Sequence, residues 1–71
     1  MSDMKILELF SKNLRRMMKE ENMRQEDLAK EIGVSRQMVS KYINGQCVPS
    51  YFTIVRMSEA LFCSLEEFVQ E

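Results

Sequence analysis

The chain has 71 residues, of which 45% are hydrophobic and 30% charged, and its formal net charge is −1. Two glycines and one proline favour a compact helical chain over a disordered one. No stretch approaches the roughly 18 consecutive apolar residues that a membrane helix requires. With no histidine, no CxxC pair and two cysteines, neither a metal site nor a disulfide scaffold is predicted.

These properties predict one domain over residues 1–71, located in the cytoplasm and without a signal peptide or a cofactor. In that reducing compartment Cys47 and Cys63 are expected to be free thiols. Cys63 is expected to face the core, whereas Cys47 lies in a predicted loop and is expected to be exposed and oxidisable.

The first predicted helix runs from about Met4 to Glu21. Residues 1–3 are expected to be frayed, although Ser2 or Asp3 could cap this helix. Asn22 follows as a candidate left-handed residue at the helix end. The apolar side chains recur at helical spacing along one stripe: Ile6, Leu9, Phe10, Leu14, Met17 and Met18.

Two shorter helices are predicted next, over residues 25–32 and 36–43. Leu28, Ala29 and Ile32 lie on one face of the first of them. Gly33 can adopt the positive φ that commonly ends a helix, and the hydroxyl of Ser35 can cap the helix that follows.

The outer face of the 36–43 helix is polar and carries no acidic residue. Arg36, Gln37, Ser40 and Lys41 follow the spacing i, i+1, i+4 and i+5, and each can donate a hydrogen bond. No Asp or Glu occurs between Ile32 and Ser58. For a protein this small, the charge of one face matters more to nucleic-acid binding than the net charge.

A fourth helix is predicted over about residues 51–61, after Pro49 and Ser50. A short fifth helix is predicted over about residues 64–69. It begins with a capping box formed by Ser64 and Glu67, and its apolar face is supplied by Leu65, Phe68 and Val69.

The pattern from about Leu14 to Val69 resembles the helix-turn-helix of the Cro/CI phage-repressor family, also called the xenobiotic-response-element family. Ala29 matches the small residue where the two helices cross, and Gly33 matches the glycine of the turn. The matching positions within the motif are Gln25, Leu28, Ala29, Ile32, Gly33, Val34, Ser35, Val39, Tyr42, Asn44 and Gly45. The resemblance implies an all-α fold, a compact five-helix domain like that of lambda repressor.

The resemblance further implies binding to double-stranded DNA, with the 36–43 helix in the major groove. Gln37 and Lys41 would read bases, Ser40 would suit several base edges, and Arg36 would read a base or bind a phosphate. Residues at positions that contact the DNA backbone in the family are Gln25, Ser35, Asn44 and Arg24. Arg24 departs from the family pattern, which usually has a Ser or Thr cap there.

The resemblance also implies a homodimer on a pseudo-palindromic operator, because a single module buries too little surface for selective binding. The candidate dimer contacts are Phe52, Phe62, Phe68 and Val69. Phe62 occupies a position where the family commonly has a left-handed Gly or Asn. A bulky aromatic there would be strained, so either the helix ends differently or packing holds Phe62.

The predicted function is a sequence-specific transcriptional regulator, a repressor. The alternative is an antitoxin-like or other protein-interaction module on the same fold, with weak or no DNA binding. An enzyme is not expected, because the sequence has no histidine, no glycine-rich phosphate loop and no nucleophile–base pair. No small-molecule substrate is indicated.

Overall fold

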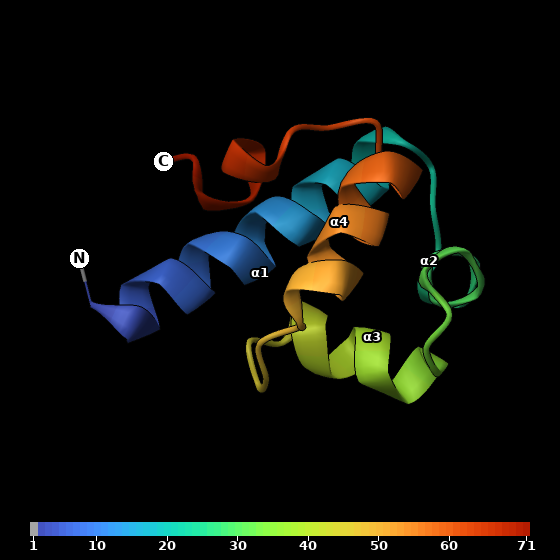
Figure 1. The fold of residues 1–71 in the computed structure, drawn as a ribbon, viewed down its shortest axis with the longest axis horizontal. Helices are drawn as coiled ribbons and strands as arrows, with labels where there is room; N and C mark the ends of the chain where they lie inside the picture. The colour runs from blue at the N-terminus through green and yellow to red at the C-terminus, as the bar shows by residue number, and fades with distance from the viewer. Residues whose placement is uncertain (1) are drawn as a thin grey trace.

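The computed structural model describes residues 2–71, which form four α-helices and one short 3-10 helix. The helices are α1 (Asp3–Glu20), α2 (Gln25–Ile32), α3 (Arg36–Ile43), α4 (Tyr51–Ala60) and the 3-10 helix η1 (Leu65–Val69). In Figure 1, η1 folds back over α1, so the two ends of the chain lie at the same end of the molecule. α2 packs against both α3 and α4, and α1 packs against α3 and η1.

One apolar core joins all five elements. Leu14, Leu28, Ile32 and Val39 are fully buried in it. The rings of Phe10 from α1 and Phe68 from η1 lie 5.4 Å apart between centroids, at a tilt of 40°. The predicted stripe of α1 is buried from Leu9 to Met18, whereas Ile6 is exposed.

Three serines cap three of the α-helices, as their hydroxyl oxygens accept backbone N–H groups. Ser2 accepts from Lys5 at 3.2 Å, Ser35 from Met38 at 3.1 Å and Ser50 from Thr53 at 3.2 Å. These caps explain why α1, α3 and α4 begin where they do.

At the N-terminus, Ser2 is the N-cap of α1, one of the two capping residues predicted, and Asp3 is the first residue of the helix. The predicted fraying of residues 1–3 stays a prediction, and Met1 lies outside the described residues. The helix starts one residue earlier than predicted because Ser2 supplies the cap. α1 also ends one residue earlier, and Asn22 then adopts the expected positive φ, at 54°.

The prediction of five α-helices was also wrong in its last member. Residues 64–69 do form a turn, and the Glu67 carboxylate accepts the Ser64 backbone N–H at 2.6 Å, but this turn is a 3-10 helix. The Asn13 amide of α1 donates to the carbonyls of Phe68 and Gln70, at 2.9 and 2.8 Å. The Asn13 amide therefore satisfies two carbonyl oxygens at the end of η1.

The conformation of Phe62, at the end of α4, differs from both alternatives predicted from the sequence. α4 ends at Ala60, and Phe62 adopts the left-handed conformation with φ of 55° while remaining 84% exposed. Packing therefore does not hold it. The Cys63 N–H donates to the Ser58 carbonyl at 3.0 Å, the bond of a Schellman end, so backbone hydrogen bonding maintains the strained residue.

The two cysteines are free, and each is half-buried against the core. Cys47 is thus less exposed than its predicted loop suggested; its Sγ lies 3.8 Å from the Sδ of Met38. Burial, together with the nearby Glu67, raises the pKa of the Cys63 thiol, so it stays protonated and behaves as an apolar side chain. No helix within residues 2–71 has the length and apolar character needed to cross a membrane.

Candidate nucleic-acid interface

The turn between α2 and α3 is built around Gly33. Gly33 has φ of 73°, and its N–H and that of Val34 both donate to the Ala29 carbonyl, at 2.9 and 3.1 Å. This left-handed residue ends α2 and redirects the chain into α3. Ala29 is buried beneath the turn, which lets α2 and α3 approach closely.

Two arginines from distant segments bind the C-terminal ends of these helices. Arg56 of α4 donates to the carbonyl of Ile32, the last residue of α2, at 3.4 Å. Arg15 of α1 donates to the carbonyl of Ile43, the last residue of α3, at 2.6 Å. A cation at a helix C-terminus meets both free carbonyls and the negative end of the helix dipole. α2 and α3 are therefore positioned from outside the motif as well as by their shared core.

The outer face of α3 is polar and open to solvent. Arg36, Gln37 and Lys41 are exposed, and neither cation forms an ion pair with any residue of the described chain. Ser40 is half-buried, and its hydroxyl accepts from the side-chain amide of Asn44 at 3.5 Å. The structure thus places the four predicted base-contacting residues on one surface, with Ser40 set deeper than the others.

The opposite face of α3 anchors it. Val39 and Tyr42 are buried in the core, and burial raises the pKa of the Tyr42 hydroxyl. Apolar anchoring on one side and hydrogen-bonding tips on the other give α3 a fixed rotation about its axis. The tips are therefore presented in a constant orientation.

A second polar surface lies beside the first, at the start of α2. A shallow hollow of about 390 Å³ is lined by Gln25 and Arg24 together with Arg15, Lys19 and Ile43, among other residues. The sequence analysis assigned Gln25 and Arg24 to backbone contact but not Arg15 or Lys19. Their i, i+4 spacing on α1 was the available signal, but only the fold brings that pair to the end of α2.

Arg24 is an unusual residue at the helix start because it cannot accept a hydrogen bond. The Asp27 carboxylate accepts the Arg24 backbone N–H at 3.0 Å, and the Arg24 guanidinium pairs with Glu26 and Asp27, at 3.1 and 3.2 Å. The backbone N–H and then the guanidinium lower the pKa of the Asp27 carboxyl, and the bond to Asp27 raises the pKa of Arg24. This exposed network binds the N–H of Arg24 itself, but the N–H groups in the first turn of α2 receive no side-chain acceptor from Arg24.

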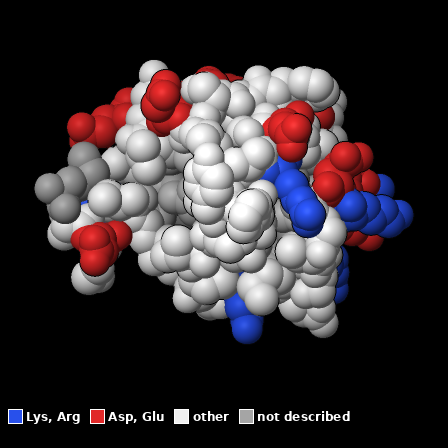
Figure 2. All heavy atoms as spheres, viewed as in Figure 1, with Lys and Arg blue, Asp and Glu red and all other residues white. Residues whose placement is uncertain are grey.

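The remaining predicted backbone contacts lie at the two ends of α3. The Ser35 hydroxyl oxygen is occupied by the cap, although its O–H remains available to donate. Asn44 is exposed at the C-terminal end of α3. Figure 2 shows that the lower edge of the molecule over α3 carries basic and uncharged side chains, whereas acidic ones lie elsewhere.

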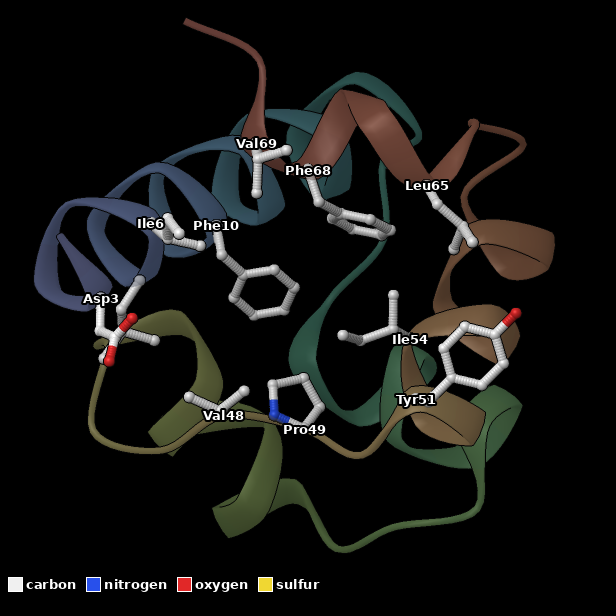
Figure 3. Close-up of a pocket in the computed structure, with 11 residues that line it drawn as sticks. Asp3, Ile6, Phe10, Val48, Pro49, Tyr51, Ile54, Leu65, Phe68 and Val69 are labelled. Atoms are coloured by element: carbon white, nitrogen blue, oxygen red, sulfur yellow. The ribbon is translucent and has the colours of Figure 1, made fainter. Parts of the chain in front are cut away.

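The structure does not bring the four predicted dimer-contact residues together. Phe68 is 2% exposed because it packs on Phe10, where both rings line the pocket in Figure 3, so its side chain is not available for the predicted dimer contact. Phe52 and Phe62 are both exposed but lie at opposite ends of α4. Val69 is exposed beside Phe68 at the end of η1.

Comparison with known proteins agrees with this geometry. A family model described as "Helix-turn-helix" matches residues 14–68. An uncharacterized HTH-type transcriptional regulator, YqaE of Bacillus subtilis (strain 168), is 31% identical over 58 residues. That match covers 82% of this chain but 50% of YqaE, so the chain spans about half the length of this relative.

Two solved structures share the fold. The restriction-modification controller protein C.AhdI from Aeromonas hydrophila superposes with a TM-score of 0.81 at 29% identity, covering 87% of this chain and 94% of that one. The SOS-response transcriptional repressor LexA from Eubacterium rectale gives a TM-score of 0.87 at 22% identity, covering 94% and 71%. The family model over residues 14–68 and the 31% identity to YqaE, together with the turn at Gly33 and the polar face of α3, show that the chain belongs to the Cro/CI-type helix-turn-helix family of DNA-binding regulators.

Proposed function

We propose that this chain is a sequence-specific transcriptional repressor that binds a pseudo-palindromic operator as a homodimer in the cytoplasm. The observation that carries the proposal is the outer face of α3, where exposed Arg36, Gln37 and Lys41 have no acidic neighbour on the helix and no ion pair within the described chain. The similarity to YqaE, an HTH-type transcriptional regulator, supports the regulatory role.

The mechanism assigns different tasks to the two polar surfaces. Gln37 can form two hydrogen bonds with adenine, and Lys41 can donate to guanine in the major groove. Arg36 reads a base or binds a phosphate, and Ser40 contacts a base edge from its deeper position. Base contacts of this kind carry the sequence information.

Phosphate contacts would set the position of the protein on the duplex. The hollow at the start of α2 offers the Gln25 amide beside Arg15 and Lys19, and the N-terminal end of a helix favours anions. Ser35 and Asn44 would contact the backbone at either end of α3. Arg24 would have to exchange its carboxylate partners for a phosphate, which is feasible because its side chain is 75% exposed.

The test is selection of duplexes from a random pool, followed by titration of the selected site over a range of salt concentrations. Affinity should fall steeply with salt, because neutralised phosphates release counterions. Gln37→Ala should lose about 1–3 kcal/mol of discrimination at one base position, whereas Asn44→Ala should weaken all duplexes alike. Lys5→Ala, in the first turn of α1, is the matched control and should change neither property.

The alternative function is an antitoxin-like or other protein-interaction module. It would be favoured if the pool yielded no preferred sequence and duplex affinity showed no salt dependence. The exposed aromatic side chains of Phe52 and Phe62 favour this alternative, because exposed apolar surface is typical of protein-interaction sites.

A further inference from the structure

Arg15 of α1 takes part in two neighbouring features of the molecule. Its Nη1 donates to the carbonyl oxygen of Ile43, the last residue of α3, at 2.6 Å. The same side chain lines the hollow at the start of α2, where Ile43, Lys19 and Gln25 also lie. The hydrogen bond to α3 is therefore made beside the surface that, under the proposed function, receives a DNA phosphate.

The carbonyl of Ile43 obtains its partner from Arg15. The carbonyls of residues 40–42 accept the backbone N–H groups of residues 44–46, which follow the helix. The Ile43 carbonyl instead accepts from the Arg15 side chain. A cation at this place also meets the negative end of the helix dipole. Arg15 thus holds the C-terminal end of α3, as the turn at Gly33 holds its start.

The guanidinium of Arg15 has donors left for a second partner. Arg15 is exposed and forms no ion pair within residues 2–71. A guanidinium carries five N–H donors in one plane, and the bond to Ile43 uses one of its nitrogens. Arginine often binds a phosphate through two parallel hydrogen bonds. One side chain can therefore bind the end of α3 and a phosphate at the same time.

The charge of the hollow favours an anion. Lys19 lies one helical turn after Arg15 and likewise forms no ion pair with a described residue. None of the residues that line the hollow is acidic. The N–H groups in the first turn of α2 receive no side-chain acceptor from Arg24, and free N–H groups at a helix start attract anions.

We propose that Arg15 couples phosphate binding to base reading. A phosphate in the hollow would fix the orientation of the guanidinium, and the guanidinium would hold the end of α3 where Gln37 and Lys41 reach their bases. A contact to the DNA backbone carries no sequence information directly, but one that also fixes the reading helix increases discrimination between sequences. Arg15 is therefore a positioning residue for specificity, whereas Lys19 contributes affinity alone. The inference deepens the proposed function and rests on it.

Arg15→Lys separates the charge of this residue from its geometry. Both side chains are cationic and attract phosphate. Lysine, however, is a point charge on a flexible stem and lacks the planar fork of arginine. It therefore cannot hold the Ile43 carbonyl and a phosphate in one fixed plane. Arg15 is exposed, so the variant should fold, which far-UV circular dichroism will report.

The test compares a selected duplex with a duplex of unrelated sequence, each titrated with the whole chain at several salt concentrations. For Arg15→Lys, the affinity for the unrelated duplex and the slope of its salt dependence should be unchanged, because the charge is retained. The ratio of the two affinities should fall about fivefold, which corresponds to the loss of one hydrogen bond. A merely structural role would lower both affinities together and leave their ratio unchanged.

Lys19→Gln is the matched control, because Lys19 lines the same hollow from the same helix, and no hydrogen bond joins its side chain to α3 in the described part of the chain. It should weaken both duplexes equally and reduce the salt slope by about 1, with the ratio unchanged. The inference is overturned if Arg15→Lys keeps the ratio of the unmodified chain, or if Lys19→Gln lowers the ratio as much. Selective, salt-dependent binding by the unmodified chain would in either case still support the proposed function, whereas the absence of any preferred duplex would overturn both.

Discussion

The guanidinium of Arg15 lies 2.6 Å from the carbonyl oxygen of Ile43 and so connects the middle of α1 to the last residue of α3. This charged hydrogen bond should stabilise the attachment of α3. We expect Arg15→Gln to lower the free energy of unfolding by about 1 kcal/mol, the value typical of a hydrogen bond at a partly solvated site. Urea denaturation followed by circular dichroism measures the change, with Lys12→Gln, an exposed lysine on the same helix, as the control. Equal stability of the two variants would contradict the expectation.

Asn13 holds η1 in place through two hydrogen bonds to the carbonyls of Phe68 and Gln70. Asn13→Ala should lower the free energy of unfolding by about 2 kcal/mol or more, because a buried carbonyl left without a donor loses its compensation for desolvation. Ser11→Ala is a suitable control: Ser11 is also buried, but its hydroxyl donates to Glu8 within the same helix. A loss no greater than that of Ser11→Ala would show that Asn13 is dispensable.

Asn13→Asp should add a dependence on pH. A carboxylate there would place one oxygen against two carbonyl oxygens in a buried site. The Arg16 guanidinium, 3.5 Å from Oδ1, opposes this effect only through a long contact, so the folded-state pKa should lie above its unfolded value. The variant should therefore be most stable below the unfolded pKa of an aspartate, about 4, and should lose stability as pH rises through the folded pKa. Urea titrations at several pH values, compared with Asn13→Ala, provide the measurement. A variant whose stability rose with pH relative to Asn13→Ala would refute this assignment.

Phe62 carries a conformational cost that a smaller residue would relieve. A side chain in the left-handed region costs about 1–2 kcal/mol relative to glycine, and Phe62 offsets none of this by burial. We expect Phe62→Gly to raise the free energy of unfolding by about 1 kcal/mol. Asn22→Gly, at the other non-glycine residue with positive φ among those described, should gain less because Asn tolerates this conformation. Thermal unfolding compares the two, and a destabilised Phe62→Gly would indicate contacts not seen here.

Arg24 should affect stability and DNA affinity in opposite directions. Arg24→Ser introduces a hydroxyl that can accept the N–H groups at the start of α2, and should raise the free energy of unfolding by about 0.5–1 kcal/mol. If Arg24 contacts a phosphate, the same variant should weaken duplex binding and reduce the slope of its salt dependence by about 1. Calorimetry and salt-dependent titration measure the two effects. Unchanged duplex affinity would remove Arg24 from the interface while leaving the rest of the site in place.

The bounds of most helices in this fold depend on residues that are close together in the sequence. The bounds of α2 and α3 were predicted correctly, because Gly33 and Ser35 specify a turn and a cap through their own backbone and side-chain properties. The polar face of α3 followed from helical periodicity alone. The start of α1 was missed by one residue, and the 3-10 form of η1 was missed because its hydrogen-bond partner, Asn13, lies 55 residues from Phe68.

The sequence by itself determined where the helices lie, which face of α3 is polar and which family the pattern matches, since spacing of a few residues controls each of these. Only the tertiary structure decided that Arg15 and Arg56 bind the ends of α3 and α2, that Phe68 is buried, and that Asn13 holds η1 against α1. Each of these depends on the approach of segments far apart in the chain, which is set by packing of the whole core and not by local periodicity.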